Sequence, residues 1–226
     1  MWCVAVLTEQ YRQRMYELLD LYARPWRADE PVICVDEKSK QLLHESRPCL
    51  PMVPGTPLRR DYEYVRSGTC NVFVAVEPRG GRRVTQVTDH RGKADFVAFV
   101  QHLIDTVYRS ARRIHLVLDN LDTHFRACFI QILGARVASK LLRRVVFHYT
   151  PKHASWLNQA EIEISLLTRQ CLGKRRIPSL RFLKAECRAW NRQINRDRVT
   201  IHWKFTRRDA HRVFHHQPNL FTRSQH

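Results

Sequence analysis

The sequence predicts an α/β domain with a mixed central sheet flanked by helices. Residues 32–35 are a continuous apolar run, as in a strand buried on both faces of a sheet. Strand-like segments on either side of Gly80-Gly81 predict an antiparallel hairpin. A helical pattern then leads into a second buried strand at residues 114–118. Helices that alternate with buried strands, around a sheet that also holds a hairpin, define this fold class.

The first sixty residues predict a helix, a strand and a loop. Residues 8–22 place apolar side chains on one helical face behind a Thr8 cap, which predicts an entry helix. The strand at residues 32–35 leads into Asp36, so we expect this acid at the carboxyl end of the strand. Residues 47–60 contain four prolines and predict an irregular loop or flap.

The middle of the chain predicts three strands and a long helix. Residues 69–78 predict a strand, and residues 82–88 alternate as a half-buried edge strand does. Residues 93–109 carry apolar side chains at helical spacing. The strand at residues 114–118 ends in Asp119.

The last third of the chain is mostly helical. Residues 124–142 predict two helical pieces broken near Gly134, and residues 145–149 predict the last strand. Residues 179–194 predict an amphipathic helix. We expect the basic, histidine-rich tail from about residue 206 to be weakly ordered.

A predicted helix that starts at Ser155 carries two acids. Its apolar residues recur at steps of three and four on one face, which we expect to be core. Glu161 lies on one shoulder of that face and Glu163 on the other, because a helix turns by about 100° per residue. In the simplest interpretation both are solvated acids near a helix N-terminus, where the helix dipole favours negative charge.

The chain has the charge of a protein that binds polyanions. Its 226 residues contain 39 Lys and Arg against 21 Asp and Glu, which gives a net charge of +18. The basic residues lie in short clusters within folded-looking sequence, so nucleic acid is the expected partner. A basic protein at a membrane surface is the alternative. The length and the 44% hydrophobic content suit one sizeable core.

Cysteine and histidine usage indicates a reduced protein without a structural zinc site. The seven cysteines are widely spaced, with no C-x-x-C, and we expect buried thiols. The twelve histidines do not lie beside cysteines at zinc-finger spacing. The sequence contains no apolar run of membrane-spanning length and no signal segment, so we expect a cytoplasmic protein that does not enter membranes.

Asp36 and Asp119 both follow buried strands, and Glu161 lies on a helix that follows another strand. Sites in α/β sheets lie beyond the carboxyl ends of strands, so we expect these acids to converge. Each aspartate also has an ordinary explanation, since Asp119-Asn120 is turn chemistry and an acid after a strand often caps a helix. Carboxylates gathered against a polyphosphate need hard cations such as Mg²⁺ to offset their repulsion.

Four sequence blocks resemble one family of transposases. They are VICVDEKSKQLL, DYEYVRSGTCNVFVAVEP, LVLDNLDTH and FHYTPKHASWLNQAEIEISLLTRQCL. Through them the chain is similar to transposases of the bacterial insertion-sequence 630 family, mariner-like proteins with a DDE active site. The resemblance implies a ribonuclease H-like fold of the DDE transposase/integrase superfamily. It makes Asp36, Asp119 and Glu161 the three catalytic acids and metal ligands, with Glu163 a structural neighbour.

The resemblance also implies cofactors, partners and a domain organisation. Two ions, Mg²⁺ or Mn²⁺, are expected at the acids, with Asp36 as the bridging ligand. The expected partner is double-stranded DNA, both transposon ends and target, and a homodimer is left open. The expected organisation is an entry helix in residues 1–28, the catalytic domain in residues 29–205 and a basic tail in residues 206–226.

Residues near the acids are further candidates. We expect Asn120 and His124 to orient Asp119, although an Asn turn and a histidine at a helix start explain them equally well. Lys152 and His153, in the loop before the helix, are candidates for phosphate contacts, with a solvated loop as the alternative.

Three departures from the family pattern accompany the resemblance. Asp119 and Glu161 are further apart than in mariner-type elements, which fits an enlarged loop or helix at residues 134–144. The family's helix-turn-helix modules have no counterpart before Trp2, and the tail loses the resemblance after Ala210. We therefore expect a shortened protein that lacks recognition of transposon ends. The rival classes are a related metal-dependent nuclease without joining activity and a non-catalytic DNA-binding remnant.

Overall fold

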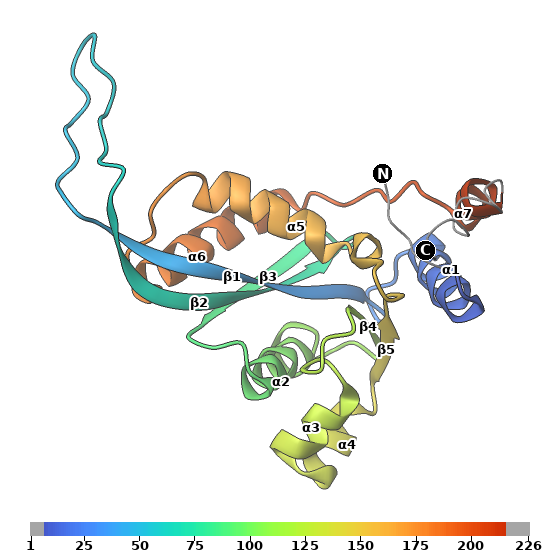
Figure 1. The fold of residues 1–226 in the computed structure, drawn as a ribbon. Helices are drawn as coiled ribbons and strands as arrows, with labels where there is room; N and C mark the ends of the chain where they lie inside the picture. The colour runs from blue at the N-terminus through green and yellow to red at the C-terminus, as the bar shows by residue number, and fades with distance from the viewer. Residues whose placement is uncertain (1–6, 216–226) are drawn as a thin grey trace, which may run out of the picture.

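A five-stranded mixed sheet organises the chain (Figure 1). The computed structural model describes residues 7–215. The strands are β1 (Val32–Glu45), β2 (Tyr64–Glu77), β3 (Arg82–Thr88), β4 (Ile114–Leu118) and β5 (Val145–Tyr149). They lie in the order β3-β2-β1-β4-β5, with β1, β2 and β3 antiparallel and β1, β4 and β5 parallel. The predicted mixed sheet is confirmed, and β3 is an edge strand as expected.

Helices cover both faces of the sheet (Figure 1). The helices whose buried residues share a core with one face are α1 (Glu9–Ala23), α5 (Ala160–Leu166) and α6 (Leu180–Asp197). The opposite face carries α2 (Lys93–His102), α3 (Arg126–Leu133) and α4 (Ala135–Leu142). The two pieces predicted around Gly134 are therefore α3 and α4. A π-helical turn, Leu103–Val107, extends α2.

Alternation along the strands separates two sets of core side chains. Ile33, Val35 and Phe73 belong to the core on the α2 face. Cys34 and Val74 belong to the cores on the α1, α5 and α6 face. Successive side chains of a strand point to opposite faces, so each position of β1 is assigned to one face by its place in the alternation.

The entry helix and its cap follow the prediction. Thr8 Oγ1 accepts a hydrogen bond from the Tyr11 amide at 3.1 Å, which satisfies one of the free N–H groups at the start of α1. The apolar face of this helix is buried through Tyr11, Met15, Leu18, Leu19 and Tyr22.

Strand β1 is longer than predicted. We expected the strand to end at Asp36, but β1 continues to Glu45 because β2 pairs with it over that length. Its parallel pairing with β4, in contrast, stops at Cys34 and Val117. Asp36 therefore lies just beyond the parallel pairing but inside the antiparallel one. The run of apolar residues ends at Val35, and the mostly polar residues that follow do not have a composition typical of a strand.

The helix expected from Ser155 is interrupted. A 3₁₀ turn at Ser155–Leu157 precedes α5, and a π-helix at Leu167–Leu172 follows it. The continuous apolar spacing predicted one helix because all three pieces share a buried side.

The tail is more ordered than predicted up to residue 215. Residues 207–215 form α7 (Arg207–His215), which packs on α1 through buried Ala210. Arg207 forms an ion pair of 2.8 Å with Asp20 and lies over the ring of Tyr16. The prediction for the last residues of the tail lies outside the described residues.

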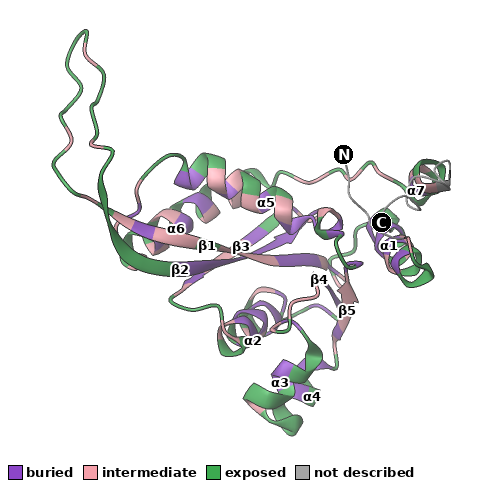
Figure 2. Ribbon diagram, in the orientation of Figure 1, coloured by how far each residue is buried: buried purple, intermediate pink, exposed green. Residues whose placement is uncertain are grey.

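Residues 46–63 project from the sheet as a long, mostly exposed arm (Figures 1 and 2). The prediction of an irregular loop here is confirmed. Arg176 anchors the base of the arm, because it pairs with Glu45 at 2.5 Å and donates to the carbonyl oxygens of Asp61 at 2.6 Å and Glu63 at 2.7 Å.

The cysteines within residues 7–215 are all free thiols, and each of them except Cys49 is buried, as the sequence predicts. In the same part of the chain, every helix is too short or too polar to cross a membrane.

A buried ion pair joins the edge strand β3 to α5. Arg83 Nη2 lies 2.9 Å from Glu163 Oε1, and the two side chains are 1% and 0% exposed. The same guanidinium donates to the carbonyl oxygens of Gly81 and Val199. Asn195 of α6 holds the Arg83 backbone through two hydrogen bonds of 2.8 Å. Glu163 is thus a buried anchor of α5, not the solvated acid of the simplest interpretation.

Replacing Glu163 with Gln is expected to lower the free energy of unfolding by about 3–5 kcal/mol, because it leaves the Arg83 charge buried without a partner. The matched control is Glu186→Gln, since Glu186 pairs with Arg175 at 2.6 Å where both side chains are partly exposed. Exposed pairs contribute about 0–1 kcal/mol. Urea unfolding measures both variants, and equal losses would contradict the anchoring role of Glu163.

Two histidines meet between β4 and β5. His115 Nδ1 and His148 Nε2 lie 2.9 Å apart, a hydrogen bond that two neutral rings satisfy. Burial, together with the positive charges of His115 and Arg24, lowers the pKa of His148 to about 4. Burial and Arg24 also lower the pKa of His115, against a smaller effect of Glu30.

The protein is expected to lose stability as the pH falls from about 6.5 toward about 4. Both histidine pKa values are lowered by folding, so the unfolded chain takes up protons first. The contribution is complete above the unfolded pKa and is lost below it. Thermal unfolding across this range should show a smaller decline for His148→Gln than for the wild type. Identical profiles would show that the histidine pair does not control acid stability.

Candidate active site

Asp36 and Asp119 lie side by side where the parallel strands end. In the register of β1 and β4, Cys34 pairs with Val117, and each aspartate stands two residues further along. Side chains two residues apart on a strand point to the same face. By this alternation Asp36 is on the α5 side of the sheet, the side on which Cys34 is buried, and Asp119 directly follows the last residue of β4.

Glu161 approaches the same place from the first turn of α5. Just before this helix, Asn158 Nδ2 donates to the carbonyl oxygen of Val35 at 2.9 Å. Its Oδ1 accepts from the Ala160 amide at 3.2 Å. Asn158 is 1% exposed, so both contacts are shielded from water. The start of α5 is thereby held against β1, one residue before Asp36.

Asp36 experiences the charges of its acidic neighbours. Burial raises the pKa of Asp36 to about 7, with help from the negative charges of Glu161, Glu37 and Asp119. A hydrogen bond of 2.8 Å from the Glu37 amide opposes this rise. The charges of Glu161 and Asp119 both act on Asp36, so the three candidate acids lie near one another.

His124 connects Asp119 to Glu37. Its Nδ1 lies 2.5 Å from Asp119 Oδ1, and its Nε2 lies 3.1 Å from Glu37 Oε2. The ring is 0% exposed and packs on Phe96, with ring centroids 4.3 Å apart. Glu37 also lies 3.8 Å from Arg91. With an acid at each ring nitrogen, His124 is placed to be an imidazolium.

Hydrogen bonds determine the charges in this bridge. Burial alone would lower the pKa of His124, but the hydrogen bond with Asp119 and the nearby Glu37 carboxylate raise it to about 9. Burial would likewise raise the pKa of Asp119, but the hydrogen bond from His124 lowers it below its ordinary value. Asp119 is therefore held as an oriented carboxylate.

The other sequence candidates lie in different surroundings. Asn120 Nδ2 donates to the carbonyl oxygen of Thr150 at 2.6 Å, and its Oδ1 accepts from Arg14 at 2.9 Å. Its side chain thus joins the end of β4 to α1 and to the loop after β5. Lys152 and His153 are exposed in that loop, and His153 has a φ of 64°, which is uncommon for a residue other than glycine.

The donor set of the three acids suits a hard divalent cation. Asp36, Asp119 and Glu161 supply only oxygen ligands, which Mg²⁺ and Mn²⁺ accept. Among residues 7–215, no three His, Cys, Asp or Glu side chains are spaced to surround one ion as they stand. Two-metal sites divide their acids between ions roughly 4 Å apart, so they do not require all three on one ion. The chemistry of the donors fits such a group.

Glu37 and Asn158, which support the acids, were not singled out from the sequence. Glu37 directly follows Asp36 and therefore points to the other face, where its partner His124 is distant in sequence. Asn158 did carry a signal, because it stands three residues before Glu161, the spacing of a residue that caps a helix.

The five-stranded mixed sheet with helices on both faces is a ribonuclease H-like fold of the DDE class. A family model described as "DDE superfamily endonuclease" matches residues 31–184, more than half of the chain. The chain belongs to this family. A comparison with curated proteins found no match.

Solved structures of the Mos1 mariner transposase are similar in fold. The Mos1 strand transfer complex matches with a TM-score of 0.57 at 15% identity, covering 88% of this chain and 60% of that chain. The Mos1 paired-end complex with Mn gives a TM-score of 0.54 at 15% identity, covering 88% and 61%. The complex with Mg gives 0.54 at 16% identity, covering 94% and 62%. This chain thus spans less than two thirds of the Mos1 chain.

Replacing Asn158 with Ala is expected to lower the free energy of unfolding by about 1–3 kcal/mol, because it leaves the Val35 carbonyl and the Ala160 amide without their buried partner. The matched control is Asn191→Ala, since Asn191 Oδ1 has no hydrogen-bond partner in the described part of the chain. Chemical denaturation compares the two. If the Asn191 variant loses as much unfolding free energy as the Asn158 variant, the role of Asn158 in fixing α5 to β1 is contradicted.

Proposed function

We propose that the chain is the catalytic part of a transposase that cuts and joins DNA with divalent metal ions. The observation that supports the proposal is that the charges of Glu161, at the start of α5, and of Asp119, after β4, both act on Asp36 of β1. Strand cutting and strand joining both displace one oxygen at phosphorus by another, which is the chemistry that such acid clusters support.

DNA is the proposed substrate on grounds of charge and similarity. The net charge of +18 favours phosphate contacts that do not depend on base sequence. The similar Mos1 structures are described as paired-end and strand transfer complexes. Lys152 and His153, exposed beside the start of α5, are proposed to contact phosphates near the acids.

Each acid has a proposed role that follows from its surroundings. The charges of both Asp119 and Glu161 act on Asp36, and in this proposal Asp36 would be the ligand that the two ions share. Bound Mg²⁺ or Mn²⁺ ions supply activation of the attacking oxygen and stabilisation of the leaving oxygen. Asp119 and Glu161 each complete one side of the site. His124 keeps Asp119 ionised and oriented, as ligands are held in other metal sites.

A finer assignment rests on the sequence blocks. The LVLDNLDTH and TPKHASWLNQAE motifs support membership of the insertion-sequence 630 family within the wider DDE superfamily. In this proposal residues 29–205 form the catalytic domain, residues 1–28 lead into it and residues 206–226 are a basic tail. Cutting double-stranded transposon ends and joining them to a target is then the reaction.

Replacing Asp119 with Asn is expected to abolish cutting and joining while leaving DNA binding within a few-fold of the wild type. The substitution keeps the size of the side chain but removes the charge that binds metal. The assay follows nicking of a supercoiled plasmid and joining of labelled DNA ends, with Mg²⁺ or Mn²⁺.

The control for this experiment is Asp122→Asn, the same chemical change at an exposed acid three residues away. It should retain activity. Activity that survives in the Asp119 variant would show that the site is misplaced. A wild-type protein that binds DNA and Mn²⁺ but never cuts would favour a non-catalytic remnant.

A further inference from the structure

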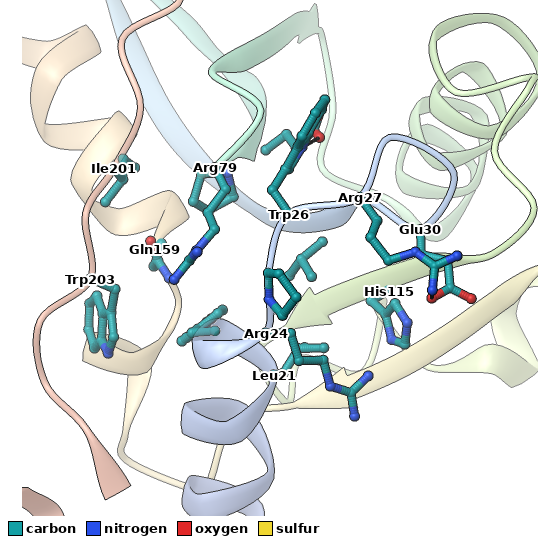
Figure 3. Close-up of a pocket in the computed structure, with 15 residues that line it drawn as sticks. Leu21, Arg24, Trp26, Arg27, Glu30, Arg79, His115, Gln159, Ile201 and Trp203 are labelled. Atoms are coloured by element: carbon teal, nitrogen blue, oxygen red, sulfur yellow. Dashed lines mark hydrogen bonds and ion pairs between the residues drawn. The ribbon is translucent and has the colours of Figure 1, made fainter.

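A pocket separate from the three acids opens on the same side of the sheet, between α1, the end of β2 and the segment after α6 (Figure 3). Its volume is about 240 Å³. Its lining combines arginines and aromatic side chains with two acids, Glu30 and Glu77. Figure 3 shows Gln159 and Arg79 between Trp203 on one side and Trp26 on the other.

Two arginines at this pocket are free to bind an anion. Arg24 and Arg79 are exposed, and within residues 7–215 neither guanidinium has a hydrogen-bond or ion-pair partner. The third arginine of the lining, Arg27, is by contrast neutralised by Asp29 at 3.0 Å and Glu30 at 3.6 Å. The pocket therefore offers two unpaired positive charges, a phosphate-binding feature.

Trp26 provides a fixed aromatic face. Its indole Nε1 donates to Glu77 Oε1 at 2.8 Å, so the ring is held in place. The residue is nevertheless 53% exposed, which is unusual for tryptophan in a folded domain. A ring that is both held and exposed suits stacking against a planar ligand.

Buried polar atoms in the lining lack partners. Gln159 is 1% exposed, and its Oε1 has no hydrogen-bond partner among the described residues. The indole Nε1 of Trp203 is likewise buried and unpaired. Unsatisfied buried polar groups are rare in folded proteins and require an explanation. Here Gln159 offers a hydrogen-bond acceptor and Trp203 a donor, which together can bond to the polar edge of a heterocyclic base.

We propose that this pocket binds one nucleotide of a DNA strand, with its base beside Trp26 and its phosphate at Arg24 and Arg79. The pocket is smaller than the roughly 300–1,000 Å³ of sites for drug-sized ligands, which fits a single base. Enzymes that hold an unstacked base read it by aromatic stacking and by hydrogen bonds to its edge. That the nucleotide belongs to a DNA strand, and is not free, rests on the proposed function.

The location of the pocket suits a strand that passes the acids. Val32 lines the pocket and lies on the same strand and the same face as Asp36, four residues away. At the rise of a strand this is about 13 Å. Gln159 also lines the pocket and stands two residues before Glu161. A nucleotide held here would fix the register of the strand relative to the phosphate that reacts.

The first test uses the full chain and 2-aminopurine deoxyribonucleoside monophosphate, whose fluorescence falls when the base stacks on an aromatic ring. We expect saturable quenching that dAMP competes away. Arg79→Ala and Trp26→Ala should weaken binding about fivefold or more, the effect of losing a stacked base or its anchor. Trp26→Phe, which keeps an aromatic face, should weaken it less.

The matched control is Arg136→Ala, which removes one exposed positive charge on α4, on the opposite face of the sheet. It should bind like the wild type. Absence of saturable quenching with the wild type would overturn the proposal, as would unchanged binding by both the Arg79→Ala and the Trp26→Ala variants. Circular dichroism verifies that each variant is folded.

The second test identifies the source of the nucleotide. A short single-stranded oligonucleotide is compared with the same strand carrying abasic sites, which keeps the phosphates and removes the bases. The wild type should prefer the intact strand, and Trp26→Ala should lose that preference. Quenching by the mononucleotide without any preference for the intact strand would overturn a DNA strand as the ligand.

These results are independent of cleavage. Nucleotide binding with no cutting of DNA would count against the proposed function and leave the pocket in place. Cutting that Asp119→Asn abolishes, without nucleotide binding at the pocket, would count against the pocket alone.

Discussion

The burial of the Asp36 carboxyl beside other acids is the constraint on which the rest of the site depends. Burial raises the pKa of Asp36, and the negative charges of Glu161, Glu37 and Asp119 add to the rise, so these carboxylates do not hold one another in place. Their positions must therefore be fixed by contacts that lie outside the cluster. Asn158 fixes the helix start against β1, and His124 fixes Asp119 from the other side.

The ion pair of Arg83 and Glu163 also helps to fix the position of α5, from a strand further from the candidate acids. Glu161 and Glu163 are two residues apart on α5, about 200° around the helix, so they cannot both face the edge strand. Burying Glu163 against β3 determines the rotation of α5 and with it the direction of Glu161. Arg83 also bonds the carbonyl of Val199, so the chain that leaves α6 toward the nucleotide pocket is fixed by the same guanidinium.

The sequence predicted an element correctly where a single run of apolar residues coincides with a single strand or helix. Residues 114–118 are buried throughout β4, and the run ends directly before Asp119, so both strand and acid were predictable. The prediction failed in β1 beyond Val35, where mostly polar residues continue the strand through their pairing with β2. The Arg83–Glu163 ion pair could not be predicted from the sequence. Arginine and glutamate usually lie on protein surfaces, and these two residues are 80 positions apart in the chain.

Glu37 shows why the residues that hold the candidate acids in place could not be predicted from sequence spacing. Adjacent residues on a strand face opposite ways, so Asp36 and Glu37 direct two acids to the two sides of the sheet. One joins the acidic cluster, and the other holds His124, whose second nitrogen holds Asp119. The Glu37–His124 contact thus couples the two acids through the core that faces α2, without a direct bond between them. The position of Asp119 is in this way fixed by a buried histidine whose other ring nitrogen faces an acid on the opposite side of the sheet from Asp36.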